Sequence, residues 1–365
     1  MRGSRGVAAV SATVALAAGV LAGCGAGSGG QTATSSTSTG GTTATAAAIT
    51  QPVVTAVTTP TVPAKDLPGT GKPVVHLGDM NTQEQFIIGQ LYQVALQHLG
   101  YTVYLNRNVG GSFSERVPAL QHGTLDIYPE YLGEWNSSIA HLHRRFRTLA
   151  ASYAAGERYA RRHGLRLLPP TPYSYTSCVA VLSQYAAENH VYSIPQLARG
   201  PGIILGASAV LQVIADGLPR LEHVYHLHPA YVQPISVGLQ YWWLNTGDVQ
   251  AAFCNTTDPL LKSPRYVMLA DPKHVFGYGN VVPVTSRRVL KAEGPAFART
   301  IERIDSLLTL EAMRGLNAEI ELGGHNPTNI AYQFLAGNHV IIPPARYAPV
   351  PTTTTATSAT TNTTT

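Results

Sequence analysis

Apolar positions along residues 74–128 recur alternately in short continuous runs and at a spacing of three or four. The runs predict strands and the spacing predicts helices. In chain order the pattern predicts a strand at 74–77, a helix from Thr82 to Leu99, a strand at 101–105, a helix at 114–122 and a strand at 125–128. This alternation is typical of a doubly wound parallel α/β sheet, in which ligands bind at the carboxyl ends of the strands.

The same alternation continues to residue 320. A helical region rich in Arg and His, 138–163, is expected to present a solvated face. Further strands are predicted at 176–182, 203–207, 249–254, 266–269 and 281–284. Further helices are predicted between residue 207 and Gly217, at 239–246 with Gly247 as the stop, at 294–308 and at 309–320.

The stretch QHGTLDIYPEYLGEW, residues 121–135, combines aromatic and acidic side chains after a strand. Pro129 has no N–H for a strand ladder, so the strand is expected to end there in a turn. The turn brings Tyr131 and Trp135 close to Glu130 and Glu134. Aromatic faces beside carboxylates attract positive charge, which favours a cation-holding pocket. The alternative is an ordinary turn with half-buried tyrosines.

The two ends of the chain differ from its middle. Residues 1–24 have a basic start, an alanine-rich apolar run and the ending Leu-Ala-Gly-Cys, which is typical of a secretory signal and resembles a bacterial lipobox. Cys24 is then the lipid attachment site of an exported protein; an ordinary signal with an incidental Cys is the alternative. Residues 25–71 predict a disordered Gly/Ser/Thr/Ala tether, and residues 346–365 predict a Thr-rich disordered tail, glycosylated or passive.

Composition narrows the function classes. Charged residues make up 12% of the chain, and the formal net charge of +5 is spread without a long basic run, so nucleic acid is not an expected partner. No GxSxG, HExxH or phosphate-binding loop occurs, so neither an enzyme nor a cofactor is expected. His223, His226 and His228 could offer a metal site, but no recognised ligand spacing accompanies them, which favours ordinary surface histidines.

A set of motifs in a fixed order resembles a known family. They are LGDMNTQEQFIIGQL, NVGGS, ALQHGTLDIYPEYLG, ADGLPRLEHVYHL, GLQYWWLNTGDV, NTTD and LNAEIELGGHNPTNIAYQFL. Together they resemble the glycine betaine, choline and osmoprotectant substrate-binding proteins of ABC importers, and the resemblance covers nearly all of residues 73–338. YPEYLG is the most specific of the motifs.

The resemblance implies a type II periplasmic binding-protein fold with two α/β lobes and a ligand cleft between them. The first lobe would be 72–171 plus 280–345, and the second would be 172–279. The implied function is capture of a small solute by a monomer, outside the cell membrane, for delivery to permease and ATPase subunits. Such a site needs preorganised contacts and a hinge rather than a nucleophile.

The family's ligand contacts carry over to this chain only in part. In the family, tyrosines box a quaternary ammonium group, and a Lys, an Arg and a Thr hold the carboxylate. Tyr131 matches a box tyrosine. The remaining positions depart from the pattern. The family Lys falls on Met80, beside a matching Asn81; the family Arg falls on Ile214, and the family Thr falls on Glu134. The other three box tyrosines fall on Ser177, which is near Tyr175, on Asn255, and on Gly279, which is beside Tyr278.

These departures remove two cations and add a carboxylate, so a betaine carboxylate would be penalised. The hypothesis is a choline-like cation held by Tyr131, Tyr175, Tyr278 and Glu134. The alternative is that the alignment slips by one or two residues, in which case Tyr175 and Tyr278 belong to a conventional box. A surface-binding or sensor protein that keeps the scaffold without a transport role is a second functional possibility.

Cys178 and Cys254 are the only cysteines after Cys24. A pair of cysteines in an exported protein is often bridged, and the resemblance would place both on strands of the second lobe beside box positions. A disulfide next to the pocket is therefore predicted, with two separately buried thiols as the alternative.

Overall fold

A computed structural model of the chain describes residues 66–107, 109, 113–344 and 347, all within one unit, Pro60–Thr365. The predicted signal, Cys24, most of the tether and, apart from Tyr347, the predicted tail lie outside the described residues. Across the described ranges, no helix combines the length and the hydrophobicity needed to span a bilayer.

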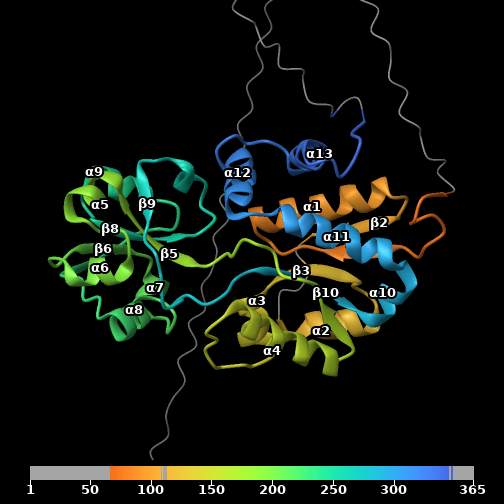
Figure 1. Cartoon of the computed structure of the whole chain (residues 1–365), viewed down its shortest axis with the longest axis horizontal. Helices are drawn as coiled ribbons and strands as arrows, with labels where there is room; N and C mark the ends of the chain where they lie inside the picture. Colours follow the sequence, from red (N-terminus) through yellow and green to blue (C-terminus); the bar gives the residue numbers. More distant parts are fainter. Residues whose placement is uncertain (1–65, 108, 110–112, 345–346, 348–365) are drawn as a thin grey trace, which may run out of the picture. The chain divides into compact units, whose positions relative to one another are not determined.

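The first sheet has the strand order β2-β1-β3-β10-β4 (Figure 1). Its strands are β1 (Val75–Gly78), β2 (Val103–Asn106), β3 (Ile127–Tyr131), β4 (Leu165–Leu167) and β10 (Val281–Ser286). β1 runs parallel to β2 and β3, as the alternation predicted, whereas β10 returns antiparallel to β3 and β4. We call this sheet and its helices the first lobe.

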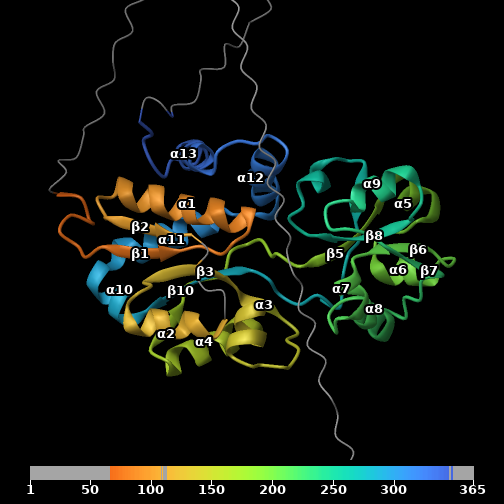
Figure 2. The ribbon, with the colours of Figure 1, turned by 180° about the vertical axis from the view of Figure 1, so that it is seen from behind.

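Helices cover both faces of the first sheet (Figures 1 and 2). One face carries α1 (Gln83–His98), α11 (Pro295–Leu307), α12 (Leu310–Glu321) and α13 (Pro327–Gly337); the other carries α2 (Phe113–His122), α3 (Leu132–Glu134), the π-helix η2 (Trp135–Ile139) and α4 (Leu149–Arg162). Each face of the sheet packs against its helices in a separate hydrophobic core. Alternate residues of β3 point to opposite faces, so Ile127 and Tyr131 pack in one core and Tyr128 packs in the other. The remaining helix, α10 (Arg287–Glu293), follows β10 directly.

The second sheet, which defines the second lobe, has the order β7-β6-β8-β5-β9. Its strands are β5 (Ser177–Leu182), β6 (Ile204–Ala207), β7 (Tyr231–Pro234), β8 (Ala251–Asn255) and β9 (Tyr266–Met268). Its helical segments are α5 (Ser183–Asn189), α6 (Ile194–Arg199), α7 (Ala209–Val213), α8 (Leu218–Tyr225), α9 (Gln240–Thr246) and the 3₁₀ helix η3 (Pro259–Lys262). Cys178 on β5 lies opposite Cys254 on the antiparallel β8, and the two form a disulfide with Cα atoms 4.9 Å apart.

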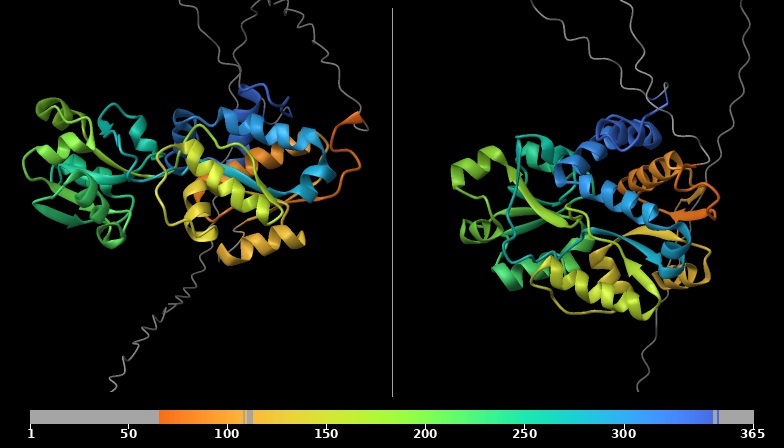
Figure 3. Two further views of the ribbon diagram at one scale, coloured as in Figure 1. Left: turned by 60° about the horizontal axis from the view of Figure 1, so that its bottom comes forward. Right: turned by 45° about the vertical axis from the view of Figure 1, so that its right-hand side comes forward.

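Two chain segments connect the sheets and run side by side (Figure 3). Ser174 and Asn280 form an antiparallel bridge, the Tyr175 N–H donates to Gly279 O at 3.0 Å, and the Gly279 N–H donates to Ser174 Oγ at 2.8 Å. A Cβ added at Gly279 would lie 1.7 Å from Tyr175 O, so this close approach requires glycine. The lobe boundaries near 172 and 280 stay a prediction.

The expectation that the strand before Pro129 ends in a turn is wrong. Pro129 lies inside β3, where its partner on β10 is Pro283. Two prolines cannot exchange N–H···O bonds, so they form a non-hydrogen-bonded pair, and each missing N–H points away from the shared ladder. β1 pairs with β3 only through Leu77 and Ile127, so no strand on that side requires the N–H of Pro129. The strand can therefore contain Pro129 because the proline falls at a non-hydrogen-bonded position opposite β10 and beyond the pairing with β1.

Several helix predictions need adjustment. The region expected as one helix at 138–163 contains the end of η2, a loop and α4, and the helix expected between residue 207 and Gly217 is the short α7, with α8 beginning at Leu218. The elements that were not predicted are β4, α3, α5, α6, β7, α8, η3, α10 and α13. All of them except α13 have at most eight residues, which is too short for a hydrophobic period to show. The predicted helix start at Thr82 is confirmed, since Thr82 Oγ1 accepts the Gln85 N–H at 3.3 Å.

Candidate ligand-binding site

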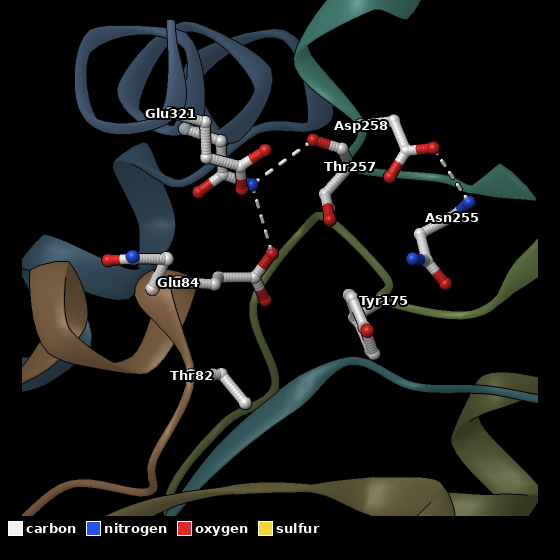
Figure 4. Close-up of a pocket in the computed structure, with 9 residues that line it drawn as sticks. Thr82, Glu84, Tyr175, Asn255, Thr257, Asp258 and Glu321 are labelled. Atoms are coloured by element: carbon white, nitrogen blue, oxygen red, sulfur yellow. Dashed lines mark hydrogen bonds between the residues drawn. The ribbon is translucent and has the colours of Figure 1, made fainter. Parts of the chain in front are cut away.

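A pocket of about 130 Å³ lies where the start of α1, the connection at Tyr175, the loop after β8 and α12 come together (Figure 4). Its lining residues are Thr82, Gln83, Glu84, Tyr175, Asn255, Thr257, Asp258, Asn317 and Glu321. They come from both lobes. Three of the nine are carboxylates and none is Lys, Arg or His.

Glu84 is the buried acid of this pocket, with a relative exposure of 5%. It stands in the first turn of α1, where a carboxylate suits the helix dipole. Its Oε1 accepts the hydroxyls of Tyr131 at 2.9 Å and Tyr173 at 3.0 Å, and its Oε2 accepts Asn317 Nδ2 at 3.3 Å. Burial raises the pKa of Glu84, although these donors and Thr257 act in the opposite direction.

Asn317 joins the buried acid to the second lobe. Its Nδ2 donates to Glu84 Oε2 and also, at 3.1 Å, to the carbonyl oxygen of Thr257. Because both partners are acceptors, the amide orientation is determined and the other atom must be the oxygen. That Oδ1 is buried and accepts no hydrogen bond from the residues that the structure describes.

Asp258 organises the loop after β8. Its Oδ2 accepts Gln240 Nε2 at 3.0 Å, Tyr241 Oη at 3.0 Å and the Asn255 N–H at 3.1 Å. The helix α9 therefore supplies two of the three donors that hold this carboxylate at the pocket. Arg314 acts electrostatically on the same carboxylate, while its own Nε donates to Thr256 O at 2.8 Å.

Glu321, in the last turn of α12, is exposed and makes no hydrogen bond or ion pair with another described residue. Figure 4 shows its carboxylate on the same side of the pocket as that of Glu84. Partial burial, then the negative charges of Asp258 and Glu84, raise the pKa of Glu321. The three acids thus repel one another, and a positively charged ligand would relieve the repulsion.

The aromatic part of the pocket is a single ring with a second ring behind it. Tyr175 lines the cavity, and Tyr131 stacks on it with ring centroids 4.9 Å apart and an interplanar angle of 28°. Tyr131 is 8% exposed and belongs to the core of the first lobe. Burial, followed by the charges of Glu84 and Asp258, raises the pKa of Tyr175 to about 12, so its hydroxyl is protonated at neutral pH.

Residues 73–337 match the family described as the substrate-binding domain of the ABC-type glycine betaine transport system. The chain belongs to this family. The glycine-betaine-binding protein of Pseudomonas aeruginosa is 26% identical over 279 residues, covering 73% of this chain and 88% of that protein. The glycine betaine-binding protein YehZ of Escherichia coli is 26% identical over 287 residues, covering 74% of this chain and 93% of that protein.

A crystal structure described as a glycine betaine/carnitine/choline ABC transporter superimposes with a TM-score of 0.67 at 22% identity, covering 73% of this chain and 99% of that one. The predicted family and the predicted two-lobed α/β fold of a periplasmic binding protein are therefore confirmed. The chain is a substrate-binding protein of an ABC transporter of the glycine betaine/choline type, not an enzyme. Binding proteins of such importers work outside the cytoplasm together with permease and ATPase subunits.

Within this binding protein, two of the predicted contacts, Tyr175 and Asn255, line the pocket. Tyr131 lies directly behind Tyr175. Ser177 is the β5 partner of Asn255, one strand away from the lining.

The other predicted contacts do not line this pocket. Met80 packs against the first-lobe core, Asn81 is exposed before α1, and Ile214 is 40% exposed at the end of α7. Glu134 is exposed and its Oε2 accepts the Ser138 hydroxyl at 3.1 Å, while the Tyr278 hydroxyl donates to Arg147 O at 2.8 Å. Ligand contact by these five residues stays a prediction.

The acidic residues of the binding protein's pocket were missed by residue-by-residue transfer, although they lie in the matching motifs. Glu84 lies in LGDMNTQEQFIIGQL, Asp258 ends NTTD, and Asn317 and Glu321 lie in LNAEIELGG. Asn317 and Glu321 are four residues apart, which places them on one face of a helix. This spacing was the sequence signal that could have identified them as neighbours in one site.

Glu130, the other carboxylate of the opening stretch, has a structural role. It is fully buried and accepts Arg116 Nη1 at 2.6 Å, the Tyr131 N–H at 2.8 Å and the Tyr128 hydroxyl at 3.2 Å. It therefore anchors β3 rather than facing the ligand.

The histidine cluster forms no metal centre within the described ranges, where no group of three His, Cys, Asp or Glu residues is placed to hold a metal ion. His223, His226 and His228 are exposed, and His226 ends α8 in the left-handed conformation with φ of 57°.

Proposed function

We propose that this substrate-binding protein captures a small organic cation without a carboxylate, choline-like rather than glycine betaine, and delivers it to the permease and ATPase of an importer. The observation that carries the proposal is the charge of the pocket. Glu84, Asp258 and Glu321 line it, and no basic side chain does.

The charge argument separates the two ligand types. A cation gains from the field of three carboxylates, whereas a zwitterion brings a fourth carboxylate into the same small cavity. Two like charges 5 Å apart repel by about 3 kcal/mol at an effective dielectric constant of about 20. This corresponds to roughly a hundredfold difference in affinity. The names of the relatives, both glycine betaine-binding proteins, support a small ammonium compound as the ligand class.

Calorimetric titration of the purified protein with choline and with glycine betaine tests the proposal. Choline is expected to bind at least tenfold more tightly, and tighter binding of glycine betaine would refute the proposal. Glu321→Lys places a cation at the pocket and is expected to narrow or reverse the preference. Glu311→Lys, a charge change at an exposed site on the same helix, is the matched control and should leave the preference unchanged.

Uptake of labelled choline by intact cells separates the transport role from the surface-binding alternative. Loss of uptake on deletion of the gene supports the importer. Tight binding with unchanged uptake indicates a surface-binding or sensor protein on the same scaffold.

The proposed location is the outer face of the cell membrane, with lipid attached at Cys24 and the protein acting as a monomer. The support is the Leu-Ala-Gly-Cys ending of the signal segment and the family's place in importers. Metabolic labelling with a fatty acid should mark the protein and fail to mark Cys24→Ser. Release of the unaltered protein into the medium would contradict the anchor.

A further inference from the structure

The pocket contains hydrogen-bond acceptors that the protein itself leaves unused. Asn317 is 3% exposed and lines the cavity, yet its Oδ1 accepts no hydrogen bond within the described part of the chain. The Asp258 hydrogen bonds all go to Oδ2, so Oδ1 is unused among the described residues, and neither oxygen of Glu321 has a partner there. Of these acceptors Asn317 Oδ1 is the buried one, and because buried acceptors in native proteins are normally satisfied, it points to a ligand that donates hydrogen bonds.

Glu84 differs from these residues, because both of its carboxylate oxygens already accept hydrogen bonds from the protein. Glu84 takes the hydroxyls of Tyr131 and Tyr173 and the amide of Asn317, so it contributes charge rather than a free acceptor. The acceptors that remain for a ligand therefore come from α12 and the loop after β8.

The aromatic surface of the same pocket is small. A fully methylated ammonium group has no N–H and is stabilised mainly by the faces of surrounding rings. Tyr175 is the single aromatic residue among those that line the described cavity, and one of its faces is covered by Tyr131. Asn255 and Gly279 stand at two of the positions where the family pattern has box tyrosines, and Gly279 has no room for a side chain.

We infer that the cation bound here carries N–H donors, as a protonated primary amine does, rather than three methyl groups. The inference rests on the proposed function and specifies the cationic group of its ligand. A primary ammonium has three donors, and three residues of the pocket, Asn317, Asp258 and Glu321, have at least one unused oxygen each. Charge-assisted hydrogen bonds of this kind are the strong ones, and a trimethylammonium group has no N–H with which to form them.

Calorimetry with ethanolamine and choline tests the inference, because the two cations differ only in the three N-methyl groups. The full-length protein should bind ethanolamine at least ~10-fold more tightly, the effect of one charge-assisted hydrogen bond. Glu321→Gln should weaken ethanolamine binding ~10-fold and weaken choline binding less. Glu311→Gln, which removes a charge from an exposed site on the same helix, should change neither affinity.

A second variant addresses the buried acceptor. Asn317→Ser keeps a polar side chain but removes Oδ1, and circular dichroism verifies that the variant is folded. Its loss of affinity should be larger for ethanolamine than for choline. An equal loss of affinity for both cations would mean that Asn317 has only a structural role, and it would overturn the inference that its Oδ1 accepts a hydrogen bond from the ligand.

The outcomes separate this inference from the function on which it rests. Choline binding as tightly as ethanolamine, with both tighter than glycine betaine, overturns the inference and leaves the proposed function standing. Glycine betaine binding most tightly of the three overturns both.

Discussion

The buried carboxyl of Asp305 should make the stability of the protein fall as the pH rises. Asp305 lies on α11 with a relative exposure of 2%, in the core between α11 and α1. Tyr92 donates its hydroxyl to Oδ1 at 2.5 Å, and Oδ2 has no partner among the described residues. Burial raises the pKa of Asp305 well above its ordinary value, and Glu302 adds to the shift while the Tyr92 hydrogen bond opposes it.

The sign follows from proton linkage. The folded protein binds the Asp305 proton more tightly than the unfolded chain, so its stabilising contribution is complete below the unfolded pKa and is lost as the pH rises toward the folded one. In that window one proton changes the free energy of unfolding by about 1.4 kcal/mol per pH unit. The loss ends where the pH passes the folded pKa of Asp305, which burial raises well above its ordinary value.

Asp305→Asn removes the titration while its Oδ1 can still accept the Tyr92 hydroxyl. The new amide N–H₂ has no acceptor and costs about 1–3 kcal/mol at every pH, so the slope rather than the absolute stability is the informative quantity. Urea unfolding at constant ionic strength, from pH 4 to 8, should give a wild-type-minus-variant difference that falls as the pH rises, by about 1.4 kcal/mol per pH unit at most. Glu311→Gln is the control that keeps the wild-type slope. Parallel curves for the wild type and Asp305→Asn would refute the reasoning.

Three further perturbations test the framework around the pocket. Arg116→Ala leaves the buried Glu130 without its partner at 2.6 Å and should cost about 3–5 kcal/mol in urea unfolding; a loss below about 1 kcal/mol would contradict this account. Removing the bridge between Cys178 and Cys254, which are 76 residues apart, should cost about 4–5 kcal/mol, and two titratable thiols without reductant would show that the bridge is absent in solution. Gly279→Ala forces the connecting segments apart, because its Cβ would lie 1.7 Å from Tyr175 O, and should lower choline affinity about tenfold or more. Gly337→Ala, with open space around its Cβ, should leave affinity unchanged.

Local signals in the sequence were sufficient for only part of the regular elements. The Thr82 cap, the helix ended by Gly247 and the parallel order of β1, β2 and β3 depend on neighbours a few residues apart or on a periodic pattern. The family, and with it the two-lobed architecture, followed from the order of the motifs. Short elements such as β4 and α6 escaped because one turn or three strand residues show no period.

The sequence by itself determined most of the strands, several of the long helices and the family, and it singled out Tyr131 and Tyr175, which stack on each other at the pocket. Only the tertiary structure decided that Pro129 belongs inside a strand, because that depends on its register opposite β10 and on where the pairing with β1 stops. It also decided which acids line the pocket: Glu130 is paired with Arg116, whereas Glu84, Asp258 and Glu321 meet at one cavity although 237 residues separate the first from the last. Charges from distant segments act on one another only when folding brings them together and removes water, and no local pattern in the chain records that distance.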